Sequence, residues 1–138
     1  MFYSSVNYGA VVIAALASTV VGFLWYSPLL FAKPWMKYMD LDAKKLKASQ
    51  KQMNKSYGIS FIATIVTAYV IALLLNATLV IGISEGMMLG AVVWLGFVAT
   101  TILTSVLFAK MPWGLFLINS GHQLASILVM SAILTAWS

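Results

Sequence analysis

Four long apolar runs divide the chain, and they constrain its fold more than any other feature. Each exceeds the roughly 20 residues that a helix needs to cross the hydrocarbon core of a bilayer, and none contains a lysine or an aspartate. A backbone in lipid must satisfy its own hydrogen bonds, so such runs are expected to be helices. The sequence therefore predicts an all-α polytopic membrane protein, one four-helix bundle over residues 1–138. The predicted spans are about 6–31, 56–79, 85–109 and 112–137.

The composition agrees with this class and argues against several others. Only 8% of the residues are charged and 62% are hydrophobic, whereas a soluble domain carries about 25% charged residues. The absence of cysteine removes disulfides, thiolate metal sites and iron–sulfur clusters. All eight basic residues are lysines, and seven of them lie in one short segment. We therefore expect no arginine-rich voltage sensor, no nucleic-acid groove, no metal site and no cofactor.

The lysines also predict how the chain is oriented. Seven lie between the first two spans, Lys110 lies between the last two, and the connection between spans two and three has no charge before Glu85. The positive-inside rule then places both lysine-bearing connections in the cytoplasm and both termini outside. The start "MFYSSVNY" lacks a basic segment, so the first span is expected to be retained rather than cleaved as a signal peptide. The predicted location is the inner, plasma membrane of a prokaryote.

The segment 33–55 has apolar residues at roughly helical spacing, among them Trp35, Met39 and Met53, with lysines over much of the rest. This pattern favours an amphipathic helix lying in the membrane interface and attracted to anionic lipid headgroups. The alternative is a solvated loop whose charges only set the topology. The lysines assigned to headgroup contact are Lys33, Lys37, Lys44, Lys45, Lys47, Lys51 and Lys55.

A short phrase occurs twice, as "LFAKPW" at 30–35 and "LFAKMPW" at 107–113. Both copies end a span at the predicted cytoplasmic interface, where aromatic rings and lysines are favoured. Similar boundaries can produce similar phrases, and an internal duplication of two helical hairpins is the alternative.

Small residues recur every fourth position in two spans, so they share one face of each helix and allow a neighbouring backbone to approach closely. The first span carries such a stripe from Ala10 to Gly22, and the third begins with another. Packing between helices of one chain and a homo-oligomer interface are both open. The residues assigned to helix packing are Ala14, Ser18, Gly22, Gly82, Gly86 and Gly90.

Polar residues inside the spans are few. Asn119, His122, Gln123 and Ser126 fall at i, i+3, i+4 and i+7 of the last span, and such a row is costly in lipid. We therefore expect it to face the protein interior or a water-filled cavity. Either a packed hydrogen-bonded network or the lining of a solute path or ligand pocket would result. The full predicted layer is Asn119, His122, Gln123, Ser126, Thr64, Thr101 and Trp94.

The sequence shows no catalytic constellation. A carboxylate dyad would need two acids within the spans, which hold none beyond Glu85 at an edge. A Ser-His-acid site would need Glu85 to reach His122, and the two are predicted near opposite levels of the membrane. The expectation is a protein that is not an enzyme.

Three phrases resemble a known family: "WYSPLLFAKPWMK" at 25–37, "WLGFVATTILTSVLFAK" at 94–110 and "LFLINSGHQL" at 115–124. The chain resembles, over nearly its whole length, the small membrane proteins catalogued as domain of unknown function 1761. That resemblance implies a four-span bundle with no established activity. Within it, an aromatic residue at the place of His122 is common, which makes Asn119 the stronger site candidate.

Two function classes stay open at this stage. One is a small oligomeric transporter or channel, with the polar face of the last span lining the route. The other is a non-catalytic structural or partner-binding subunit whose glycine and alanine faces receive lipid, a second copy or another membrane protein. The expected surroundings in either case are the lipid bilayer and its anionic headgroups.

Overall fold

A computed structural model of the chain describes residues 6–39, 42–48 and 50–137. Within this part, four helices are long and apolar enough to cross a membrane. The predicted all-α fold with four membrane-spanning helices is therefore confirmed. The four spans are Tyr8–Trp25, Gln52–Ala77, Ile83–Ala109 and Trp113–Ala136.

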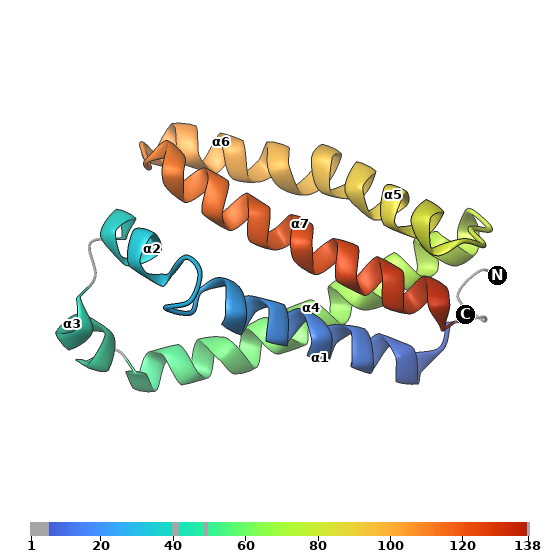
Figure 1. Ribbon diagram of the computed structural model, residues 1–138, viewed down its shortest axis with the longest axis horizontal. Helices are drawn as coiled ribbons and strands as arrows, with labels where there is room; N and C mark the ends of the chain where they lie inside the picture. The colour runs from blue at the N-terminus through green and yellow to red at the C-terminus, as the bar shows by residue number, and fades with distance from the viewer. Residues whose placement is uncertain (1–5, 40–41, 49, 138) are drawn as a thin grey trace.

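The last helix, α7, lies at the centre of the bundle (Figure 1). It packs against α1 and α4 on one side and against the α5–η2–α6 helix on the other, whereas α4 and α5 share few contacts. The elements are, in chain order, α1 (Tyr8–Trp25), α2 (Ala32–Tyr38), α3 (Ala43–Ala48), α4 (Gln50–Ala77), α5 (Ile83–Val93), η2 (Trp94–Ala99), α6 (Thr100–Ala109) and α7 (Trp113–Ala136).

The two ends of the bundle differ in charge. The short helices α2 and α3, the beginning of α4 and the α6–α7 turn lie together at one end (Figure 1). Every lysine belongs to these segments, and we call this end the lysine end. The beginning of α1, the end of α7 and the α4–α5 turn lie at the opposite end, which we call the terminal end.

The first span is shorter than predicted, because α1 ends at Trp25 rather than near residue 31. Pro28 has no N–H to donate and disfavours helical geometry in the residue before it. The chain instead turns: Ser27 Oγ donates to the Leu24 carbonyl at 2.7 Å, and the Phe31 N–H donates to the Trp25 carbonyl at 3.0 Å. This turn directs α2 across the lysine end.

The segment 33–55, in which the sequence favoured an amphipathic helix, is not one continuous helix. The segment forms the two short helices α2 and α3, and α4 begins at Gln50, six residues before the predicted start of the second span. A side-chain cap marks the beginning of α3, since Asp42 Oδ1 accepts from the Lys45 N–H at 2.7 Å. Helical spacing of apolar residues continues across such a break, so spacing alone could not locate it.

The third span contains a π-helical segment that the sequence pattern did not indicate. Residues Trp94–Ala99 form η2 between α5 and α6, within one continuous membrane-spanning helix. A π-helical turn widens the helix locally and rotates the residues that follow, and it often lies at a functional position. Here it begins at Trp94, whose ring reaches α7.

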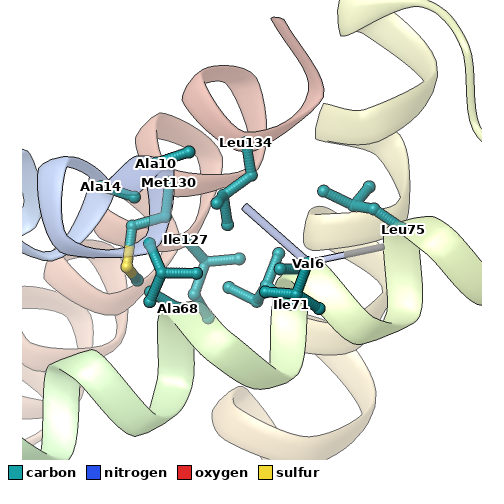
Figure 2. Packing of buried hydrophobic residues seen from close by; sticks show 11 residues of the cluster. Val6, Ala10, Ala14, Ala68, Ile71, Leu75, Ile127, Met130 and Leu134 are labelled. Atoms are coloured by element: carbon teal, nitrogen blue, oxygen red, sulfur yellow. The ribbon is translucent and has the colours of Figure 1, made fainter. Parts of the chain in front are cut away.

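The tightest packing lies in the half of the bundle nearer the terminal end. Side chains from α1, α4 and α7 point toward one another there, with Met130 of α7 among Ala10, Ala14 and Ala68 (Figure 2). Ala14 and Ala68 are fully buried. Because these alanines are small, the three backbones approach closely, as small-residue faces permit in membranes.

Candidate functional site: a cleft at the lysine end

One face of α4 is buried near the terminal end and open near the lysine end. Ala68, Ile71, Ala72 and Leu75 are buried in the core near the terminal end. The same stripe continues toward the lysine end at i, i+3, i+4 spacing, but there its residues line an open cleft. These residues are Met53, Ser56, Tyr57, Ser60, Phe61 and Thr64.

The small-residue stripe of α1 divides in the same way. Ala10 and Ala14 are buried against α4 and α7, whereas Gly22 and Tyr26 line the cleft with Ser18. The two helices therefore pack tightly near the terminal end and leave space between them near the lysine end. The cleft has a volume of about 720 Å³.

Three helices and one histidine enclose the cleft. The α1 and α4 stripes form its sides, with Thr19 and Phe23 added from α1. The turn and α2 contribute Pro28, Ala32, Trp35 and Met36, and α7 contributes His122. Among the described residues that line the cleft, aromatic rings and hydroxyls are mixed and no carboxylate or lysine is present.

A short hydrogen bond holds the wall of the cleft nearest α7. The Tyr26 hydroxyl donates to Asn119 Oδ1 at 2.7 Å, and the Tyr26 ring lies 5.1 Å from the His122 ring, centroid to centroid. His122 Nε2 in turn lies 3.3 Å from Ser126 Oγ. A β-carbon at Gly22 would stand 3.1 Å from His122 Nε2, so the glycine allows the imidazole to approach α1 closely.

Two tryptophans hold α7 from different helices. Trp25 of α1 donates its indole N–H to the Ile118 carbonyl at 2.9 Å, and Trp94 of η2 donates to the Ser120 carbonyl at 2.8 Å. Each indole thereby gains the acceptor that a buried N–H requires. The Trp25 ring also lies against Gly121, where a β-carbon would stand 3.0 Å from it.

The structure brings together only part of the predicted polar layer. Asn119, His122 and Ser126 lie on the α7 face toward α1, and Thr64 lines the same cleft as His122. Gln123, the residue after His122 on α7, points away from that face and is exposed, so its predicted inward position is wrong.

Trp94 and Thr101 lie outside this group. Trp94 bonds to Ser120, away from the cleft lining. Thr101 is exposed, and its hydroxyl donates to the Phe97 carbonyl four residues earlier at 2.7 Å. This local bond satisfies the hydroxyl and allows it to face lipid.

The glycines predicted to serve in packing have different surroundings. A β-carbon at Gly86 would overlap Thr135, and one at Gly90 would overlap Ser131, so both glycines lie directly against α7. Nothing lies within 4 Å of a β-carbon at Gly82, which is the N-cap of α5 instead. Ala14 and Ser18 are buried, and Gly22 lies against His122.

The lysines predicted to meet headgroups lie on three helices of the lysine end, and those described are exposed. The Lys51 side chain lies outside the described part of the chain. The described lysines of this set are Lys33, Lys37, Lys44, Lys45, Lys47 and Lys55.

Within residues 6–39, 42–48 and 50–137, no group of three or more His, Cys, Asp and Glu side chains is placed to hold a metal ion.

Several residues of the cleft were not identified from the sequence. Tyr26 continues the stripe of Ala10, Ala14, Ser18 and Gly22, so its spacing was the available signal. The α4 stripe also has helical spacing, but Met53 was assigned to an interfacial helix. No sequence signal indicated that Tyr38 of α2 would lie against Gly114 of α7.

The fold and the cleft define a multi-pass integral membrane protein of four spans. A family model described as "Protein of unknown function (DUF1761)" matches residues 9–135. The chain therefore belongs to this family, and the resemblance noted in its sequence is confirmed. No curated protein and no solved structure matched the chain.

Proposed function

We propose that this protein binds a small amphiphilic molecule from the membrane in the cleft between α1, α2 and α4. The observation that carries the proposal is the volume of about 720 Å³ between two helices that are otherwise closely packed. Ligand sites in proteins commonly have volumes of about 300–1,000 Å³, with mostly apolar walls and a few polar groups. The cleft fits this description in both size and lining.

The polar groups of the cleft suit an uncharged part of a ligand. The Tyr26 hydroxyl uses its proton in the bond to Asn119, which leaves its oxygen free to accept a further bond. The His122 imidazole lies beside it at the back of the cleft. A hydroxyl or ester group could bond here, whereas a bare charge would lack a partner of opposite sign among the described lining residues.

A transporter or channel along the polar face of α7 is less well supported. The Tyr26 hydroxyl donates a hydrogen bond to Asn119 Oδ1, and the Trp25 indole N–H donates one to the neighbouring Ile118 carbonyl. These contacts favour a packed network on that face. Transport would then have to use the cleft itself, which opens beside one helix pair and needs a second subunit to become a path. We therefore favour binding over conduction and over catalysis.

Blocking the cleft should reduce this binding. Ser60→Phe adds a ring to an exposed residue of the lining, whereas Ile59→Phe adds one to the adjacent exposed residue outside it. We expect Ser60→Phe to reduce ligand occupancy about tenfold, because steric overlap costs at least about 1.4 kcal/mol. The measurement is photolabelling in phosphatidylcholine nanodiscs by a phosphatidylcholine with a mid-chain diazirine, with the labelled residues mapped by mass spectrometry.

Labelling at cleft residues such as Phe23 and Phe61 should fall in Ser60→Phe and persist in Ile59→Phe. Equal labelling of these residues in wild type and both variants would show that lipid does not enter the cleft. Melting temperatures of the three proteins in detergent serve as the control for folding. Proton or solute flux through wild-type vesicles, abolished by Ser60→Phe, would support transport through the cleft in place of binding alone.

We also propose that the lysine end faces the cytoplasm of a prokaryotic cell and that both termini face outward. The support is the excess of lysine in the connections at that end. A reporter inserted at residue 48 should read cytoplasmic, and one fused after residue 138 should read external. A cytoplasmic reading from the C-terminal fusion would contradict this orientation.

A further inference from the structure

We infer that the ligand of the cleft is an anionic phospholipid of the leaflet at the lysine end. One acyl chain lies between α1 and α4, and the headgroup lies among the lysines of α2 and the beginning of α4. This inference rests on the proposed function and adds the ligand class to it. The depth of the cleft, the charge around its mouth and the attachment of α2 support it.

The cleft has the depth of one leaflet. Its α4 lining runs from Met53, near the lysine end, to Thr64, a distance of about 16 Å at about 1.5 Å per residue. Half of a hydrocarbon core of about 30 Å is about 15 Å. Because α1 and α4 close against each other beyond this depth, the cleft admits a chain from one leaflet only.

The charge changes sharply at the mouth of the cleft. The described lining is uncharged, whereas Lys33 and Lys37 lie on the same short helix as the lining residues Trp35 and Met36, and Lys55 precedes Ser56. All three lysines are exposed. The described interior therefore suits an acyl chain, and the rim suits a negatively charged headgroup.

The excess of positive charge at this end cannot be neutralised within the chain. The sequence has eight lysines, all at the lysine end, and three acidic residues. Of the acidic residues, Asp40 and Asp42 lie in the sequence between Lys37 and Lys44, and Glu85 lies in the first turn of α5 at the other end. Even if both aspartates were paired, 8 − 2 = 6 lysines would remain. An anionic lipid supplies the negative charge that balances these lysines.

Helix α2 is attached to the bundle, so its lysines are held beside the cleft. Tyr38 lies directly against Gly114 of α7, where a β-carbon would overlap its ring. The Trp35 ring meets the Tyr26 ring edge to face, with centroids 5.7 Å apart. A headgroup site built on an attached helix loses less entropy on binding than one built on a loose loop.

The test compares two lipids with the same chains and different headgroups. Phosphatidylglycerol and phosphatidylcholine are titrated against the full chain in neutral detergent, and bound lipid is counted by native mass spectrometry. Lys33→Gln with Lys37→Gln removes two charges at the mouth. Lys44→Gln with Lys47→Gln removes two charges on α3, whose described residues do not line the cleft.

We expect the α2 pair to weaken phosphatidylglycerol binding by about 25-fold, because each lysine near an anionic headgroup contributes about fivefold. The α3 pair should leave it unchanged, and neither pair should alter phosphatidylcholine binding. Ser60→Phe should weaken the binding of both lipids. Equal losses from the two lysine pairs would mean that the attraction belongs to the whole lysine end, and the inference would be wrong.

Failure of the inference and failure of the proposed function give different results. If both lipids bind equally and Ser60→Phe blocks both, the cleft binds amphiphiles without selecting for charge, and only the inference fails. If Ser60→Phe changes the binding of neither lipid, the bound lipid lies elsewhere and the proposed function fails as well. A dimer in light scattering that Ser60→Phe separates would show that a second copy fills the cleft, which also overturns the inference.

Discussion

Replacing Gly86 and Gly90 with leucine should destabilise the bundle by roughly 2–6 kcal/mol, because overpacking costs about 1–3 kcal/mol at each site. A β-carbon at either position would overlap a side chain of α7, Thr135 for Gly86 and Ser131 for Gly90. Both α7 residues are buried, and they lie on backbone that cannot move without disturbing the core around Met130 and Leu134. The α5–η2–α6 helix depends on α7 for most of its contacts, so it should separate from the bundle first.

The measurement is the free energy of unfolding in mixed micelles, followed by circular dichroism as denaturing detergent is added. Gly96→Leu is the matched control, since it lies on the same membrane-spanning helix and nothing is within 4 Å of its added β-carbon. We expect that variant to change stability by less than about 0.5 kcal/mol. Wild-type stability of the double variant, together with a smaller particle in detergent, would instead assign the glycines to contact between subunits.

Replacing Trp25 with alanine should cost about 3 kcal/mol, because it removes a large ring between α1 and α7 together with its hydrogen bond. The ring lies against Gly121 and Phe31, and its N–H bonds to the Ile118 carbonyl. Trp25→Phe keeps most of the ring but loses the N–H, so it should cost about 1 kcal/mol. The difference between the two variants separates packing from hydrogen bonding.

Trp113→Ala is the control, since that tryptophan is 59% exposed at the beginning of α7. We expect it to be nearly neutral in the same unfolding measurement. The Trp25 variants should also lose protection of the first half of α7 in hydrogen exchange, because α1 would no longer cover it. Equal stability of Trp25→Ala and Trp113→Ala would show that the indole contact does not hold α7 in place.

The spans could be predicted because the forces that create them are local. A run of about 20 apolar residues must satisfy its own backbone in lipid, whatever its neighbours are. The ends of the spans were less predictable. Pro28 and the Ser27 turn end α1 early, and the Asp42 cap starts a new helix inside a segment with continuous helical spacing.

The candidate site could be predicted only in part. Asn119, His122 and Ser126 were found from spacing because they share one helix face, and Thr64 was included with them in the predicted polar layer. The same argument placed Gln123 on that face, although the structure turns it outward. The spacing of residues along a helix defines a face that covers a wide angle around the helix axis. Only the neighbouring helices decide which edge of that face is covered.

The amino-acid sequence by itself determined that this chain is a four-span membrane protein, that its lysines gather at one end, and that α1 and α5 carry faces of small residues. These properties depend on composition and periodicity along single helices. Only the tertiary structure decided which helix each face meets. The glycines of α5 lie against α7, whereas the α1 stripe packs against α4 and α7 in one half and opens into a cleft in the other. A small-residue face permits close approach to any partner, so the choice of partner comes from the packing of the whole bundle.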